Sequence, residues 1–166
     1  TVTNGCGTAV ATTVVTVSAT PNAGTITGTA TVCPGNSTTL NNATSGGIWT
    51  SANTATAIIG STTGVVTGVA TGITTISYTV TNGCGTAVAT TAFTVNATPN
   101  AGSISGAATV CVGSSITLTN SVSGGAWSSS NTNATVSSGG VVTGVTAGPN
   151  VISYTVSNSC GTANAT

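Results

Sequence analysis

The segment ISYTVTNGCGTAVATTAFTV, residues 76–95, carries most of the information about the fold. Hydrophobic residues alternate with Thr and Ser on both sides of a central Asn-Gly pair, which is the pattern of two strands that each bury one face. Asn-Gly is a typical hairpin turn, so the segment predicts an antiparallel hairpin. Its many Thr and Val residues are β-branched and fit pleated sheets, which favours an all-β protein.

The same phrases return along the chain at a nearly constant interval. TVTNGCGTAVATT stands at 1–13 and returns 78 residues later, and TVSNSCGTANAT follows at 155–166. Such a period is long enough for one small domain per repeat. The phrase ATPNAG, at 19–24 and 97–102, contains Pro, Asn and Gly, which interrupt strands and mark boundaries. We therefore expect the terminal strands of a preceding repeat in 1–18, a domain in 19–96, and a domain truncated in its last strand in 97–166.

Each repeat contains a series of short runs with strand character. In the first complete repeat these runs are TITGTATVC, STTL, GIWTS, TAII, VVTGV, ITTISYTV and TAVATTAFTV. About seven short strands in a domain of this size predict a β-sandwich of immunoglobulin-like type. The aromatic residues that recur in matching runs are expected to anchor the two cores: Trp49, Tyr78, Trp127 and Tyr154.

The composition excludes several classes of function. The chain has 166 residues and contains no Lys, Arg, Asp, Glu or His. General acid–base catalysis and the activation of a Ser or Thr nucleophile both need such groups, so we predict no enzyme. Calcium and magnesium prefer carboxylate ligands, and nucleic acids are bound through Lys and Arg, so no metal, cofactor or nucleic acid is expected. The sequence contains no run of 18 apolar residues, so it predicts no membrane-spanning helix.

Five cysteines point to disulfides and to an oxidising, extracellular location. Cys33 and Cys84 lie in one repeat and Cys111 and Cys160 in the next, while Cys6 aligns with Cys84 and would pair with a residue before Thr1. Their spacing is not that of a zinc site. Pairing within each repeat is favoured because each repeat has two cysteines, and this pairing leaves neither of them unpaired. The alternative joins Cys33 to Cys160 across the junction, because the two cysteines of one immunoglobulin-like domain could lie at opposite ends.

One long segment resembles a known family. AWSSSNTNATVSSGGVVTGVTAGPNVISYTV, residues 126–156, resembles the group 2 bacterial immunoglobulin-like repeats. The recurring TVC and NGCG phrases resemble the PKD-like repeats of large secreted proteins of Gram-negative bacteria. This resemblance implies tandem immunoglobulin-like domains on the outside of a bacterium, in adhesin stalks or surface filaments, with no catalytic residues to transfer.

The lack of charge adds an expectation about partners. Proteins with no net charge tend to associate, and the sheet edges have no Lys to prevent pairing between molecules. We expect copies of the chain to assemble into a filament, sheath or stalk. Two alternatives stay open: a module that binds glycans or surfaces, and a subunit in which residues 1–17 complete the truncated domain of another copy.

Overall fold

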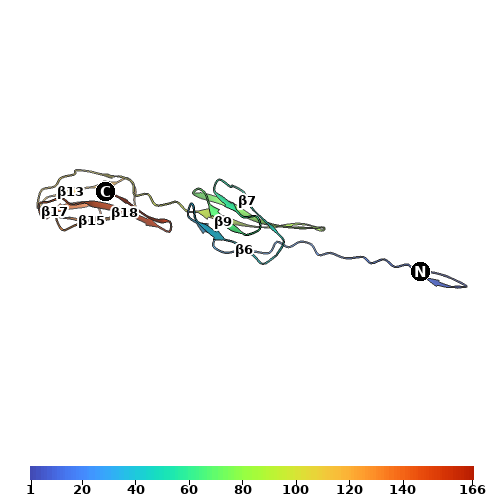
Figure 1. Ribbon diagram of the computed structural model, residues 1–166. Helices are drawn as coiled ribbons and strands as arrows, with labels where there is room; N and C mark the ends of the chain where they lie inside the picture. Colours follow the sequence, from blue (N-terminus) through green and yellow to red (C-terminus); the bar gives the residue numbers. More distant parts are fainter.

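The computed structural model describes all residues, 1–166, as an all-β protein without helices. Figure 1 shows three parts arranged in a line: an N-terminal hairpin and two compact sheet-containing parts, here called the first body (residues 19–96) and the second body (residues 97–166). Every sheet lies within one of these parts. No helix suited to crossing a membrane is present.

The first body is of β-sandwich type. One sheet has the strand order β4-β11-β10-β7, a second has the order β5-β9-β8, and β3 pairs with β6. The strands are β3 (Ile26–Thr27), β4 (Thr31–Val32), β5 (Ser37–Thr39), β6 (Asn41–Asn42), β7 (Ile48–Ser51), β8 (Ala57–Ile59), β9 (Val65–Gly68), β10 (Gly72–Asn82) and β11 (Gly85–Val95).

The predicted hairpin is the longest feature of this body. Strands β10 and β11 pair antiparallel from Gly72↔Val95 to Asn82↔Gly85. Ile76 and Phe93 are fully buried, and the alternation of the two strands follows the predicted pattern. Near its C-terminal end β11 also pairs in parallel with β4, through Val95↔Val32. The hairpin therefore runs the full length of the body and extends beyond it at the turn (Figure 1).

An aromatic pair closes the core of the first body. Trp49 lies opposite Tyr78, with 4.6 Å between the ring centroids. The Tyr78 hydroxyl donates to the Thr44 carbonyl at 2.7 Å and accepts from the Gly47 amide at 2.8 Å. A Cβ atom on Gly47 would lie 2.3 Å from the Tyr78 ring, so the absence of a side chain there allows the ring to pack directly against the backbone. The buried hydrophobic cluster contains Val32, Leu40, Trp49, Ala57, Val66, Ile76, Tyr78, Phe93 and Val95.

The second body repeats this arrangement with fewer paired residues. Its sheets have the orders β15-β18-β19, β13-β17-β16 and β12-β14. The strands are β12 (Ile104–Ser105), β13 (Ser115–Thr117), β14 (Thr119–Asn120), β15 (Ala126–Ser129), β16 (Ala134–Val136), β17 (Val141–Gly144), β18 (Ile152–Asn158) and β19 (Gly161–Ala165). Trp127 lies 4.8 Å from Tyr154 by ring centroids, but Trp127 is only half-buried, whereas the other three expected anchors are buried.

The N-terminal part consists of a hairpin and an extended segment. β1 (Val2–Asn4) pairs with β2 (Gly7–Ala9), and all residues of both strands are exposed. Residues 10–18 then run to the first body without a strand partner (Figure 1).

The strand count differs from the expected seven. The first body has nine strands, because the run at 25–33 breaks into β3 and β4, and β6 follows β5 after one residue. Gly28 lies at the first break with φ of +113°, a conformation that favours glycine. A Cβ atom there would lie 2.7 Å from the Thr39 carbonyl oxygen, so the backbone crosses closely at this point.

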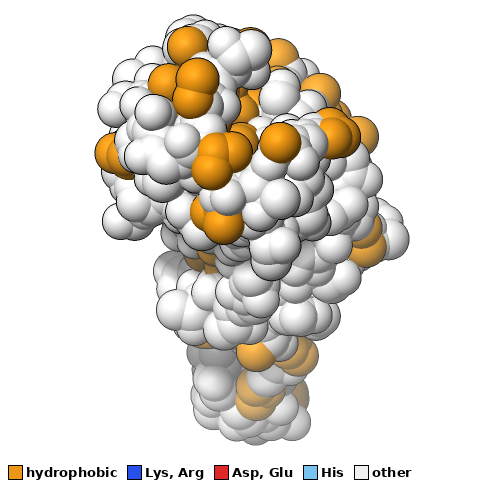
Figure 2. Space-filling view, turned by 90° about the vertical axis from the view of Figure 1, so that its left-hand side faces the viewer, with side chains coloured by type: hydrophobic (Ala, Val, Ile, Leu, Met, Phe, Trp, Pro, Cys, Tyr) orange, Lys and Arg blue, Asp and Glu red, His pale blue; other side chains and the backbone are white.

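The surface is neutral throughout. Figure 2 views the molecule from the free end of the second body and shows hydrophobic side chains scattered among uncharged polar ones, with no charged group. Exposed Val, Thr, Ser and Asn side chains therefore determine how this surface meets water and other molecules.

Candidate functional site: the junction between the two bodies

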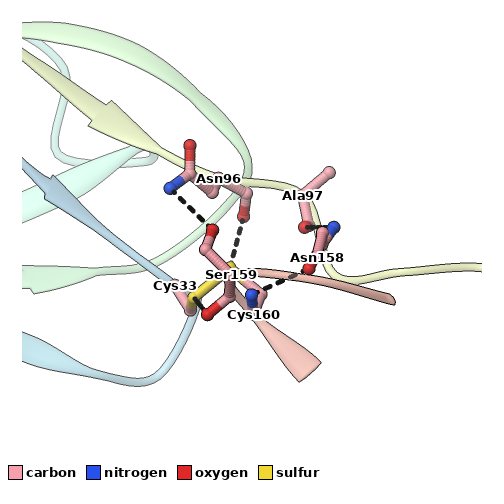
Figure 3. Close-up of a disulfide and its surroundings, with 6 residues drawn as sticks. All are labelled: Cys33, Asn96, Ala97, Asn158, Ser159 and Cys160. Carbon is pink, nitrogen blue, oxygen red and sulfur yellow. Dashed lines mark hydrogen bonds between the residues drawn. A yellow bond between two sulfur atoms is a disulfide. The ribbon is translucent and has the colours of Figure 1, made fainter. Parts of the chain in front are cut away.

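A disulfide joins the two bodies. Cys33, in the turn after β4, is bonded to Cys160, in the turn between β18 and β19, and their Cα atoms are 5.5 Å apart (Figure 3). The bond connects residues separated by 127 positions in the sequence. It fixes the hairpin turn of the second body to the end of the first body, beside the linker between them.

The favoured pairing of Cys33 with Cys84, and of Cys111 with Cys160, is therefore wrong, and the pairing across the junction is correct. Val95↔Val32 places Cys33 at the C-terminal end of β11, whereas Cys84 immediately precedes its N-terminal end. A strand of this length spans roughly 35 Å, far more than the 7 Å or so between Cα atoms that a disulfide tolerates. Cys6, Cys84 and Cys111 are free and exposed.

Hydrogen bonds hold the hairpin turn of the second body to the linker. The Asn158 side chain donates to the Ala97 carbonyl at 2.9 Å and accepts from the Cys160 amide at 2.7 Å. The Asn96 side chain donates to the Ser159 hydroxyl at 3.5 Å. Figure 3 shows these groups gathered around the disulfide. Asn158 thus forms one hydrogen bond within the turn and another to the linker.

The first body holds its own incoming linker in the same way. The Asn82 side chain donates to the Ala19 carbonyl at 3.0 Å and accepts from the Cys84 amide at 2.8 Å. The Cys84 sulfur lies 3.5 Å from the Ser18 carbonyl oxygen. In each body, therefore, an Asn two residues before a cysteine places that cysteine beside the chain that enters the body.

The turn that contains Cys33 has a counterpart with the same geometry in the second body, around Cys111. The Cys33 carbonyl accepts from the Asn36 amide at 3.1 Å, and the Cys111 carbonyl accepts from the Ser114 amide at 3.0 Å. The third turn residues, Gly35 and Gly113, have φ values of +79° and +78°. Cys111 therefore lies at the end of the second body, in a turn of the same geometry as the turn that contains Cys33 at the end of the first body.

The junction contains sulfur atoms that form a covalent link and uncharged groups that form hydrogen bonds. Its only reactive groups are sulfur atoms, since the chain contains no charged side chain. Sequence reasoning named the cysteines but missed Asn96, Asn158 and Ser159. The available signal was the Asn that stands two residues before Cys6, Cys84 and Cys160 in each copy of the repeated phrase.

No protein-family model matches the chain, and no curated protein matches it in sequence.

Proposed function

We propose that this chain is a structural segment of an extracellular filament, sheath or adhesin stalk, made of tandem immunoglobulin-like domains and secreted by a bacterium. The observation that carries the proposal is the Cys33–Cys160 disulfide beside the 96–97 linker. A flexible linker alone would leave consecutive domains free to reorient. A second, covalent connection at the same junction restricts that motion, so that the domains together behave as a rod.

The repetition of the junction supports a linear array. Asn82 and Cys84 contact residues 18–19 as Asn158 and Cys160 contact residues 96–97. A device that recurs once per repeat gives the same connection at every step along an array. Disulfides of this kind persist in oxidising surroundings, which fits a location outside the cell.

The neutral surface fits self-association. With no charged residue in the chain, copies do not repel one another, and strand edges carry no Lys that would block pairing. A glycan-binding module has less support, since such sites use exposed aromatic rings. Trp49, Tyr78 and Tyr154 are at most 6% exposed, and only Trp127 among the expected anchors is half-buried.

Electron microscopy of the native material tests the proposal. We expect long, thin particles of uniform width with a regular axial repeat of one domain. Small-angle X-ray scattering of the chain should give an elongated particle. Reduction of the disulfide should then broaden the distribution of maximum dimensions among the molecules. Compact, globular native particles would contradict a stalk or filament.

A further inference from the structure

The outer edge of strand β11 has no partner over most of its length. On one side β11 pairs with β10 from Gly85 to Val95, but on the other side β4 covers it only at Thr94 and Val95. Residues 86–92 precede this contact and have no strand beside their outer edge. An open edge of this kind offers unpaired backbone N–H and C=O groups to another strand.

Backbone geometry identifies the groups that face this edge. The N–H and C=O of one residue point to the same side of a strand, and successive residues point to opposite sides. The amides of Thr94 and Asn96 both donate to carbonyls of the segment around β4, so they face the outer edge. Two, four and more residues earlier, the backbone groups of Thr90, Val88 and Thr86 therefore face the same way.

The side chains along this edge leave room for a second strand. On the solvent face Thr86 and Thr90 are exposed and Val88 is 55% exposed. On the other face the edge has Ala87 and Ala89, which are small and only partly buried. Natural proteins commonly block such edges with Lys, Pro or a bulge. Strand β11 contains neither residue, and its pairing with β10 is continuous.

The second body shows that a preceding body does not cover this edge. There the hairpin turn is bonded to the first body through Cys160. Thr162 and Asn164 follow that turn in β19 and are the counterparts of Thr86 and Val88. Both stay exposed beside the junction. The junction therefore uses the hairpin turn and leaves the edge of the following strand free.

We propose that β11 of one copy pairs antiparallel with β11 of a second copy, around a two-fold axis at Val88. This inference deepens the proposed function, on which it rests, by naming the surface through which copies associate side by side. Val88 lies opposite Val88 of the second copy, and Thr86 lies opposite Thr90. In each of these pairs the outward backbone groups exchange both N–H···O hydrogen bonds. The two four-stranded sheets thus become one continuous sheet.

Chain geometry and side-chain matching select this register. The free stretch is limited by the turn before Gly85 and by the hydrogen bond to Ala30 at its other end. A register centred on Ala89 would move each hairpin turn two residues further, into β4 of the other copy. It would also place Val88 opposite Thr90. With the axis at Val88, two Val side chains bury apolar surface against each other, and the flanking Thr residues pair with Thr.

The second body is a weaker site for the same pairing. Asn164 stands where the first body has Val88, and its side chain accepts from the Thr155 hydroxyl at 2.8 Å. Asn is depleted in strands and has no apolar surface to bury against its copy. The lateral contact is therefore assigned to the first body.

The pairing sets the direction of neighbouring copies. The β10–β11 hairpin runs along the long axis of the molecule (Figure 1). Antiparallel pairing of β11 with its copy therefore joins two rods side by side in opposite directions. Such a contact thickens a filament or sheath without using the junction between consecutive bodies.

Sedimentation equilibrium of the whole chain tests the proposal. The Cys33–Cys160 disulfide is kept, and the free thiols of Cys6, Cys84 and Cys111 are alkylated with iodoacetamide, so that only non-covalent pairing is measured. We expect a monomer–dimer equilibrium. A chain that stays monomeric up to its solubility limit would overturn the pairing. The stalk itself would be unaffected, because microscopy of the native material tests it independently.

Amide hydrogen exchange locates the contact. Exchange is read for each residue by NMR in dilute and in concentrated solution. The amides of Thr86, Val88 and Thr90 should exchange more slowly in the concentrated sample, because the second copy accepts from them. The amides of Ala87 and Ala89 face β10 and should change little. Dimers in which the first three amides gain no protection would overturn the proposal.

Charge variants at the two-fold axis test the register. Because Val88 lies opposite its own copy, Val88→Lys brings two like charges together, and so does Val88→Asp. Each variant should raise the dimer dissociation constant about tenfold or more. An equimolar mixture of the two should restore dimers, since opposite charges then face each other. A mixture that stays monomeric would overturn the register.

Val65→Lys is the matched control. It adds the same charge at a position that is 41% exposed on β9, in the other sheet of the first body. Since Val65 and Val88 are both exposed, neither substitution removes a core contact. The control should leave the dissociation constant unchanged. A loss equal to that of Val88→Lys would mean that net charge, and not the β11 edge, governs association, which would overturn the proposal.

Discussion

The two bodies share one repeat sequence, yet matching positions are buried to different extents. Leu40 is 2% exposed and Ile76 is fully buried, whereas their counterparts Leu118 and Ile152 are only half-buried. The difference follows the C-terminal half of β11, which covers this core in the first body, whereas the positions that would match it in the second body lie beyond Thr166. One strand half therefore determines whether the sandwich is closed.

This difference shows where the stability of the repeat resides. The side chains in the walls are nearly the same in both bodies, so their hydrophobic contribution depends on the strand that covers them. A body without that strand keeps its sheets and its aromatic pair but has an open wall.

Phe93→Ala should make the first body resemble the second. The side chain is fully buried, and removing it should lower the free energy of unfolding by about 3–5 kcal/mol. Urea unfolding followed by Trp49 fluorescence, in a Trp127→Phe background, reports on this body alone. Val15→Ala, at the matching exposed position, is the control and should leave that free energy within about 0.5 kcal/mol of the starting value. A similar loss in both variants would contradict the account.

Leu40→Ala and Leu118→Ala compare the two cores at one repeat position. We expect a loss of about 2–5 kcal/mol for Leu40 and of roughly 1–2 kcal/mol for the half-buried Leu118, because the loss grows with the apolar area buried. Chemical unfolding read from the single Trp of each body measures both values. Equal losses would mean that the open wall does not weaken the second core.

Much of the fold could be predicted from the sequence because its signals are local. Alternation and the Asn-Gly turn predicted the β10–β11 hairpin, and the repeated aromatic residues predicted that Trp49 and Tyr78 lie in the core. The break at Gly28 was missed because it depends on a close crossing with the Thr39 backbone, which is 11 residues away in sequence. Propensity within a single run contains no information about such a contact.

The disulfide partner was harder to predict because it depends on the ends of a long hairpin. Sequence parity made the Cys33–Cys84 pair attractive. The parallel pairing of β4 with the end of β11 separates these two cysteines by the length of a strand. The length of β11 was the usable signal, and it pointed to a partner in the next repeat.

Tyr78→Phe and Tyr154→Phe probe the hydroxyl contacts below the aromatic pairs. The Tyr78 hydroxyl makes two hydrogen bonds, to Thr44 and from Gly47, whereas the Tyr154 hydroxyl accepts one, from Gly125. We expect losses of about 2 and 1 kcal/mol in the free energy of unfolding, since each such bond contributes roughly 1 kcal/mol. Thermal unfolding by circular dichroism measures both, and a larger loss for Tyr154→Phe would reverse the predicted order.

Changes of pH and salt should have the smallest effect, and an equal one on both bodies. With no Asp, Glu, His, Lys or Arg in the chain, no side chain ordinarily titrates between pH 4 and 7. The free energy of unfolding should therefore be flat across this range and between low and high NaCl concentrations. Denaturation midpoints at several pH values measure this, and a steep loss of either body near pH 4 would be incompatible with the neutral composition.

Disulfide mapping of the oxidised protein tests the junction most directly. Free thiols are alkylated, the chain is denatured without reduction, and chymotrypsin then cleaves after the aromatic residues, since trypsin has no site here. The account predicts a linked pair in which residues 155–166 are joined to the peptide that contains Cys33, with Cys84 and Cys111 alkylated in the monomer. Residues 79–93 linked to the Cys33 peptide, together with 155–166 linked to the Cys111 peptide, would contradict it.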